Sequence, residues 1–142
     1  MSLTEILGWC VALSAAAALM NFLLKQVSRE YVKNLSAANP QFASSYRTFM
    51  QFMIRNHRFF GMAAGALFAV HVGAVLSSGV SSFTGIAAGI LLLIVSGLGA
   101  YGFYIRKNPR GKWIHAHRGV AFLLTMAAIA HIFFKAAIYL PA

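Results

Sequence analysis

The sequence predicts an all-α protein that crosses a membrane as a four-helix bundle. Hydrophobic residues make up 60% of the 142 residues and charged residues only 10%, whereas soluble domains carry roughly 25% charged residues. The apolar residues form four runs, over about residues 3–24, 59–76, 83–105 and 113–140. Each run is close to the ~20 residues that a helix needs to cross ~30 Å of hydrocarbon. We therefore treat residues 1–142 as a single transmembrane module.

The first run is expected to be a span and not a cleaved signal peptide. It is long, and residues 1–5 lack the basic side chains with which a signal peptide begins. Cys10 is the only cysteine, which excludes an intramolecular disulfide, and the CxxCH motif of covalently attached haem is absent. The net charge of +10 does not indicate nucleic acid binding, because the basic residues flank the apolar runs and form no single patch.

The distribution of basic residues predicts the orientation of the spans. Eleven of the twelve lie in or directly beside the two segments that join span one to span two and span three to span four, while residues 77–82 carry no charge. The positive-inside rule places both basic segments in the cytoplasm and both chain termini on the exterior side. Spans two and four then run in the same direction, from the cytoplasm outward. We expect an integral protein of a bacterial inner (cytoplasmic) membrane.

The cytoplasmic segment 25–58 contains an amphipathic stretch over residues 40–56. Asn39 and Pro40 form a typical helix start, with an N-cap followed by proline at the first helical position. The apolar residues that follow fall on one helical face: Phe42, Tyr46, Phe49, Met50, Met53 and Ile54. This stretch either lies on the membrane surface or extends span two into the cytoplasm. A docking surface for a partner subunit is the alternative.

Four histidines share one spacing on spans two and four. The motif H-x13-H occurs twice, from His57 to His71 and from His117 to His131. In a helix this spacing places both members of a pair on one face, ~21 Å apart along the axis. His57 and His117 precede Arg58 and Arg118 near the cytoplasmic boundary, so the other two lie deeper, toward the exterior. His115 falls on roughly the opposite face and is left out of the set.

Ionisable side chains in a membrane span are functional candidates, because leaving them unpaired in lipid is costly. If spans two and four face each other, the four histidines form two pairs, one per leaflet. A haem iron between two imidazoles would satisfy each pair, whereas zinc requires four clustered ligands. The two carboxylates of the chain, Glu5 and Glu30, are distant in sequence. Packed histidines hydrogen-bonded to neighbouring helices, or another metal, are the alternatives.

The repeated H-x13-H on alternate helices of a four-helix core resembles the cytochrome b of quinol:cytochrome c reductases. The membrane domains of ferric reductases and NADPH oxidases look similar in outline. The resemblance covers the chain apart from the long first loop, and it implies two stacked b-type haems between spans two and four. It also implies that His57 pairs with His117 on the cytoplasmic side and His71 with His131 on the exterior side. We expect no flavin or nucleotide domain in this sequence, and an oxidase or a ferric reductase would need one, here or on a partner.

Several other residues suit haem binding. Small residues allow helices to approach a flat macrocycle closely, and cations suit the propionates. The candidates are Gly61 and Gly65 beside the macrocycle, Arg55, Arg58 and Arg118 for the cytoplasmic haem, and Lys135 for the exterior one. Gly73, Gly97, Gly99, Gly102 and residues 15–18 are further small residues in the spans. Ordinary helix packing explains single glycines equally well, and the positive-inside rule already explains the three arginines. Snorkelling to the interface is the simpler explanation of Lys135.

These observations predict an electron-transfer subunit of a larger membrane oxidoreductase complex. Two haem b groups would pass electrons across the bilayer between a redox partner and quinone, with no nucleic acid involved. Trp113, His115 and the basic loop beside them are candidates for a quinone site, although His115 is more simply an interfacial histidine. The alternatives are a ferric reductase or metal-transport core, and a chlorophyll-binding or assembly subunit of a photosynthetic or respiratory complex.

Overall fold

The structure, a computed structural model, describes residues 2–32, 34, 36–107, 111–134 and 137–139. In this part of the chain, four helices are long and apolar enough to cross a membrane, which confirms the predicted all-α class. They are α1 (Leu3–Val27), α3 (Pro40–Ser77), α4 (Phe83–Ala100) and α5 (Trp113–Phe133). Two π-helical segments, η1 (Ser28–Val32) and η2 (Tyr101–Arg106), continue α1 and α4.

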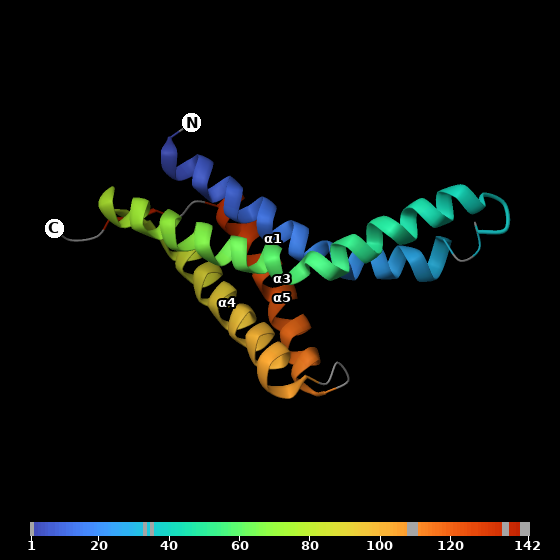
Figure 1. Cartoon of the computed structure of the whole chain (residues 1–142). Helices are drawn as coiled ribbons and strands as arrows, with labels where there is room; N and C mark the ends of the chain where they lie inside the picture. The colour runs from blue at the N-terminus through green and yellow to red at the C-terminus, as the bar shows by residue number, and fades with distance from the viewer. Residues whose placement is uncertain (1, 33, 35, 108–110, 135–136, 140–142) are drawn as a thin grey trace.

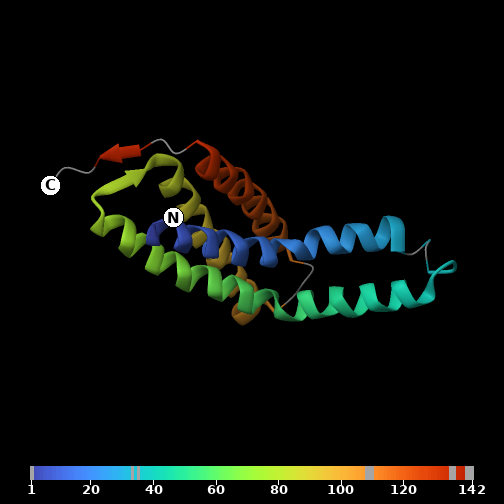
Figure 2. The ribbon, with the colours of Figure 1, turned by 90° about the horizontal axis from the view of Figure 1, so that it is seen from above.

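The four helices form two antiparallel hairpins that cross each other. α1 packs along α3, and α4 packs along α5 (Figures 1 and 2). We call the end of the bundle at residues 78–82 the neutral end, and the opposite end, where α4 turns into α5, the basic end. The two histidine-bearing helices, α3 and α5, have few direct contacts with each other. They are held in place mainly by their own hairpin partners and by α4.

The first hairpin extends beyond the second at the basic end (Figure 2). α3 begins where the sequence predicted, because the Asn39 side chain accepts a hydrogen bond from the backbone N–H of Phe42 and Pro40 is the first helical residue. The helix then continues for 38 residues, or ~57 Å, about twice the hydrocarbon thickness. Residues 40–56 are therefore an extension of the second spanning helix.

This extension is packed against the end of α1. The Tyr46 hydroxyl donates a hydrogen bond to the Leu24 carbonyl at 2.8 Å. The buried side chains of this contact come from both halves of the hairpin: Leu24, Val32, Ala43 and Met53. The face of α3 that is buried against α1 is therefore rotated slightly from the apolar face predicted from the sequence. Phe42 and Phe49, which belong to the predicted face, remain about half exposed.

The fourth span is shorter than predicted. α5 ends at Phe133, whereas the apolar run continues to Leu140. Ala137–Tyr139 instead form a strand, β2, that pairs antiparallel with β1 (Val80–Ser82) just before α4. Hydropathy does not distinguish a helix from a short apolar strand, so the pairing partner decides the conformation here. The left-handed φ of 69° at Gly79 makes the tight turn from α3 into β1.

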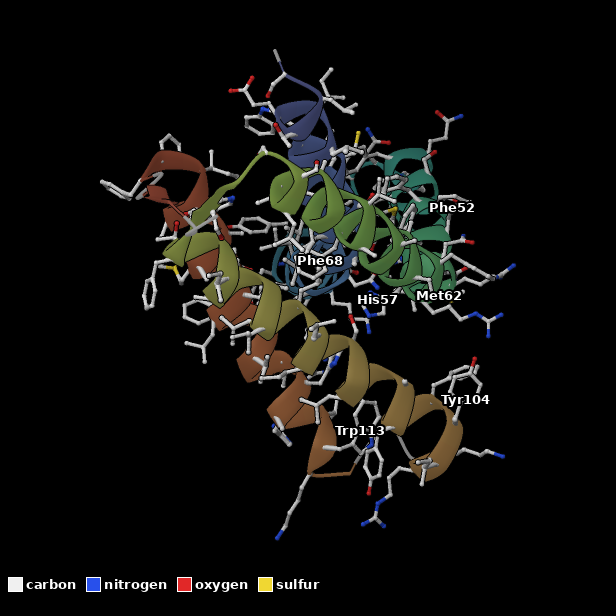
Figure 3. All side chains as sticks on the ribbon, turned by 90° about the vertical axis from the view of Figure 1, so that its left-hand side faces the viewer. Phe52, His57, Met62, Phe68, Tyr104 and Trp113 are labelled. Atoms are coloured by element: carbon white, nitrogen blue, oxygen red, sulfur yellow. The ribbon has the colours of Figure 1, made fainter. Side chains whose placement is uncertain are left out.

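A small apolar core joins the two hairpins. Its buried members come from three helices: Ala64 of α3, Leu92 and Val95 of α4, and Leu124 of α5. Phe68 packs beside this core, as Figure 3 shows from the side. A Cβ added at Gly89 would lie only 2.6 Å from the Cζ atom of Phe68. Gly89 therefore lets the Phe68 ring contact the backbone of α4.

Candidate functional site

The structure brings two of the predicted ligand histidines together. The rings of His57 on α3 and His117 on α5 have centroids 6.2 Å apart and planes 84° apart. Figure 3 shows His57 between α3 and the second hairpin, with Trp113 further toward the basic end. All four histidines of the predicted set are partly buried, whereas His115 is exposed. The exclusion of His115 from the set is consistent with its exposure.

Both histidines of this basic-end pair are held by backbone carbonyls. His57 Nδ1 lies 2.8 Å from the Ala18 oxygen of α1, and His117 Nδ1 lies 3.1 Å from the Val95 oxygen of α4. A carbonyl only accepts hydrogen bonds, so each Nδ1 must carry a proton and donate it. In a neutral imidazole, Nε2 then keeps its lone pair. Histidines that ligate metals are oriented in this way by a hydrogen bond at the other ring nitrogen.

His131, at the neutral end of α5, is held by hydroxyl groups instead. Its Nδ1 lies 3.3 Å from the Thr84 Oγ1 and 3.4 Å from the Ser82 Oγ. Both hydroxyls belong to the start of α4, which packs against the end of α5. Neither Ser82 nor Thr84 belongs to the site residues predicted from the sequence. One sequence feature could have indicated them. They lie at the start of the third apolar run, which in an antiparallel hairpin is next to the end of the fourth run, where His131 lies.

Three of the four histidine rings lie against a glycine of the neighbouring helix. A Cβ added at Gly8, Gly85 or Gly99 would lie 3.3, 2.9 or 3.4 Å from the Cε1 atom of His71, His131 or His117, respectively. Gly85 and Gly99 have the same separation along the chain as His117 and His131. Because α4 and α5 are antiparallel, this equal spacing places one glycine opposite each histidine. From the sequence, Gly99 was predicted only as a small residue of a span, and Gly8 and Gly85 were not predicted as site residues.

His71 differs from the other three histidines. Its Nδ1 atom is buried and has no hydrogen-bond partner among the described residues. An unpartnered buried nitrogen is unusual and calls for an explanation at the site itself. His71 and His131 lie on the same helices as the basic-end pair, each one H-x13-H interval further along. The topology thus places them toward the neutral end, each against a glycine of its own hairpin partner.

The glycines predicted to lie beside a cofactor have free space next to them. A Cβ added at Gly61 or Gly65 would meet no atom of the described structure within 4 Å. Gly61 lies one turn after His57 and roughly on the same face of α3. The described structure thus leaves open space beside both residues.

The predicted cationic residues have different surroundings. The Arg58 guanidinium lies over the rings of Phe59, at 4.6 Å, and of Phe103 in η2, at 5.1 Å. Arg55 and Arg118 are exposed, and Lys135 lies outside the described residues. The Trp113 ring covers Gly102 of η2, and its centroid is 6.2 Å from that of His117. Trp113 thus lies beside the basic-end pair, on the side of the loop between α4 and α5.

The residues fit a haem better than a clustered metal ion. Among the described residues, no group of three or more histidine, cysteine or carboxylate side chains is clustered as a zinc site requires.

The distance between the His57 and His117 rings does not by itself indicate a ligand pair, because it is ordinary for two packed aromatic rings. The hydrogen bonds at Nδ1 are therefore the stronger evidence. No protein-family model matches the chain, and no curated protein or solved structure is significantly similar to it.

Proposed function

We propose that the protein is a membrane electron-transfer subunit that holds two b-type haems between α3 and α5. One observation carries the proposal. His57 and His117 come from different hairpins, their rings lie 6.2 Å apart, and both direct Nδ1 at a backbone carbonyl. This leaves both Nε2 atoms available as ligands. Haem supplies one-electron redox chemistry when it is bound.

The second haem is assigned to His71 and His131. The H-x13-H spacing on each helix separates the two pairs by ~21 Å, so one lies toward each face of a ~30 Å hydrocarbon layer. With a histidine on each side, the iron would have no position open to a substrate. The chemistry of the site would then be outer-sphere electron transfer, which suits a subunit that carries electrons across a membrane.

The remaining assignments follow from position. Gly61 and Gly65 leave room for the macrocycles, and Arg58, Arg55 and Arg118 supply cations at the basic end for propionates. Electrons would be exchanged with other subunits of a redox complex and with quinone, in the inner membrane of a bacterium. For a quinone site we favour Trp113, which contacts both η2 and His117. His115 is exposed and has less support in this role.

The proposal is tested by the haem content of the purified protein. We expect a b-type spectrum with about two haems per chain for the natural sequence and about one for His71→Ala, because each pair binds independently. His115→Ala, which changes an exposed histidine of the same helix pair, should retain both. A metal without haem would favour a transporter, and chlorophyll would favour a pigment-binding subunit. Either result, or an unchanged haem content in His71→Ala, would refute the proposal.

A further inference from the structure

Ser82 and Thr84 form a directed chain of hydrogen bonds around His131. The two hydroxyl oxygens are 2.8 Å apart. The Ser82 oxygen accepts a hydrogen bond from the Gly85 backbone N–H at 3.4 Å, and the Thr84 hydroxyl donates to the Phe134 carbonyl at 3.4 Å. An N–H only donates and a carbonyl only accepts, so the two ends of the chain have fixed roles.

One arrangement of the protons matches these fixed ends. With the single hydroxyl proton of Thr84 directed at Phe134, the Thr84 oxygen accepts from Ser82 and from His131. The single proton of Ser82 is then directed at Thr84. His131 Nδ1 therefore faces two oxygens that have already donated, at 3.3 and 3.4 Å. In this arrangement Nδ1 is hydrogen-bonded to Ser82 and Thr84 only if it is protonated and donates, and in a neutral imidazole Nε2 is then unprotonated.

The groups of this chain belong to well-defined elements. Ser82 is the last residue of β1 and the N-cap of α4, and Thr84 lies in the first turn of that helix. Phe134 is the C-cap residue of α5, in the turn that follows His131. Gly85 closes the other side, because its backbone lies directly against the imidazole ring. The ring is thus confined between the start of one helix and the end of the next.

We infer that Thr84, together with Ser82, is a positioning residue that keeps the proton of His131 on Nδ1 and its Nε2 unprotonated, as a metal ligand must be. The purpose of this arrangement rests on the proposed function, but the protonation state does not. In the basic-end pair, backbone carbonyls accept the Nδ1 protons, and no substitution removes a backbone carbonyl. At the neutral end, side-chain hydroxyls accept the Nδ1 proton, so substitutions can remove them.

The hydrogen-bond chain predicts different effects of substituting Thr84 and Ser82 on the tautomer of His131. In Thr84→Val the Ser82 hydroxyl loses its acceptor, and its proton turns to His131 Nδ1, which then becomes an acceptor. The ring should change to the tautomer with the proton on Nε2. In Ser82→Ala the Thr84 oxygen still accepts from Nδ1, so the natural tautomer should persist. Thr84→Ser keeps a hydroxyl at the same position and should behave like the natural protein.

The experiment uses the full chain in detergent micelles with ¹⁵N-labelled histidine, with the His131 signals assigned from a His131→Gln spectrum. The ring nitrogens report the tautomer directly. Thr125→Val is the matched control, because the Thr125 hydroxyl donates to Ala121 within α5 and not to a histidine. A change of tautomer in Thr84→Val, with none in Ser82→Ala, Thr84→Ser or Thr125→Val, supports the inference. An unchanged tautomer in Thr84→Val overturns it.

A second measurement applies to the haem-loaded protein. A donated Nδ1 proton makes the imidazole a more basic ligand, which favours oxidised iron. An iron bound at Nε2 keeps the proton on Nδ1, so in the loaded protein Thr84→Val removes an acceptor of that proton. The midpoint potential of one haem should therefore rise, while that of the other stays unchanged. If the protein proves to hold no haem, the proposed function fails and the tautomer alone decides the inference. If haem is present and neither tautomer nor potential changes, the inference fails and the proposed function stands.

Discussion

At the residue scale, each of the four histidines contacts a backbone group or a glycine of the neighbouring helix. His57 and His117 donate to carbonyls, His131 contacts two hydroxyls, and His71 packs against Gly8. In a bilayer no water compensates an unpaired ring nitrogen, so polar side chains of a span are satisfied by other helices. The arrangement directs three Nδ1 atoms into the protein's own hydrogen bonds. The opposite ring nitrogen is the one that a further ligand would use.

Gly61 provides a test of whether a flat group lies beside α3. Alanine in a helix interior is more favourable than glycine by about 0.5–1 kcal/mol, and a Cβ at this position meets no atom of the described chain. Without a bound group, Gly61→Ala should therefore stabilise the protein. With a macrocycle in this space, the added methyl costs about 1–3 kcal/mol of binding, or roughly 5- to 150-fold in affinity.

The measurement is the retention of the basic-end haem on titration with a competing haem-binding protein. Gly73→Ala is the control, because Gly73 also has free space beside it but lies on roughly the opposite face of α3 from His57. Equal haem retention in the two variants would show that no macrocycle lies beside Gly61.

At the element scale, the extension of the first hairpin is the main feature that departs from a simple bundle. Its interface uses small and medium-sized side chains, with Ala43 and Val32 almost completely buried. Phe49 and Phe52 remain about half exposed on the same helix. The extension thus has an apolar contact with α1 and a second apolar surface that is not covered by described residues of this chain. The extension and His57 belong to the same continuous helix.

Tyr46 holds this extension through one hydrogen bond across the hairpin. Tyr46→Phe removes the donor to the Leu24 carbonyl and keeps the ring. We therefore expect the free energy of unfolding to fall by about 0.5–1.5 kcal/mol. Faster amide hydrogen exchange over residues 40–52, with unchanged exchange around Ala64, would show that the effect is local. Thr48→Val is the control, since the Thr48 hydroxyl donates only within its own helix, to Ser44. Equal effects of the two substitutions would contradict the role given to Tyr46.

At the scale of the whole molecule, the surface is that of a protein surrounded by lipid. No charged or polar residue is fully buried in the described part of the chain, and large apolar side chains such as Leu13, Phe122 and Phe133 are about two-thirds or more exposed. In water such a surface would be unfavourable. The charge asymmetry between the two ends then determines how the bundle is oriented in the membrane.

The orientation is testable with single cysteines in a Cys10→Ala background. Ser45→Cys lies on the exposed surface near the basic end, and Ser78→Cys lies at the exposed neutral end. A membrane-impermeant thiol reagent should label Ser78→Cys in intact cells and Ser45→Cys only after permeabilisation, since the positive-inside rule predicts the basic segments in the cytoplasm. Labelling of Ser45→Cys in intact cells, with Ser78→Cys protected, would reverse the orientation and the assignment of the two faces.

Much of the fold followed from local patterns in the sequence. The start of α3 at Asn39-Pro40 is an example, because a cap and a proline act over a few residues. The end of α5 did not follow, because the residues after Phe133 are apolar and their conformation depends on pairing with β1. Among site residues, spacing alone identified the histidines. Gly8, Ser82, Thr84 and Gly85 were missed, since each matters only through a contact with a distant helix.

The sequence by itself determined that this is a membrane protein of four helices with two equally spaced histidine pairs. Hydropathy, charge and helical periodicity act along the chain, so they are readable without a structure. Only the tertiary structure decided that His57 meets His117 and which group accepts each Nδ1 proton. These contacts join residues tens of positions apart, and they depend on how two hairpins cross, which no local pattern records.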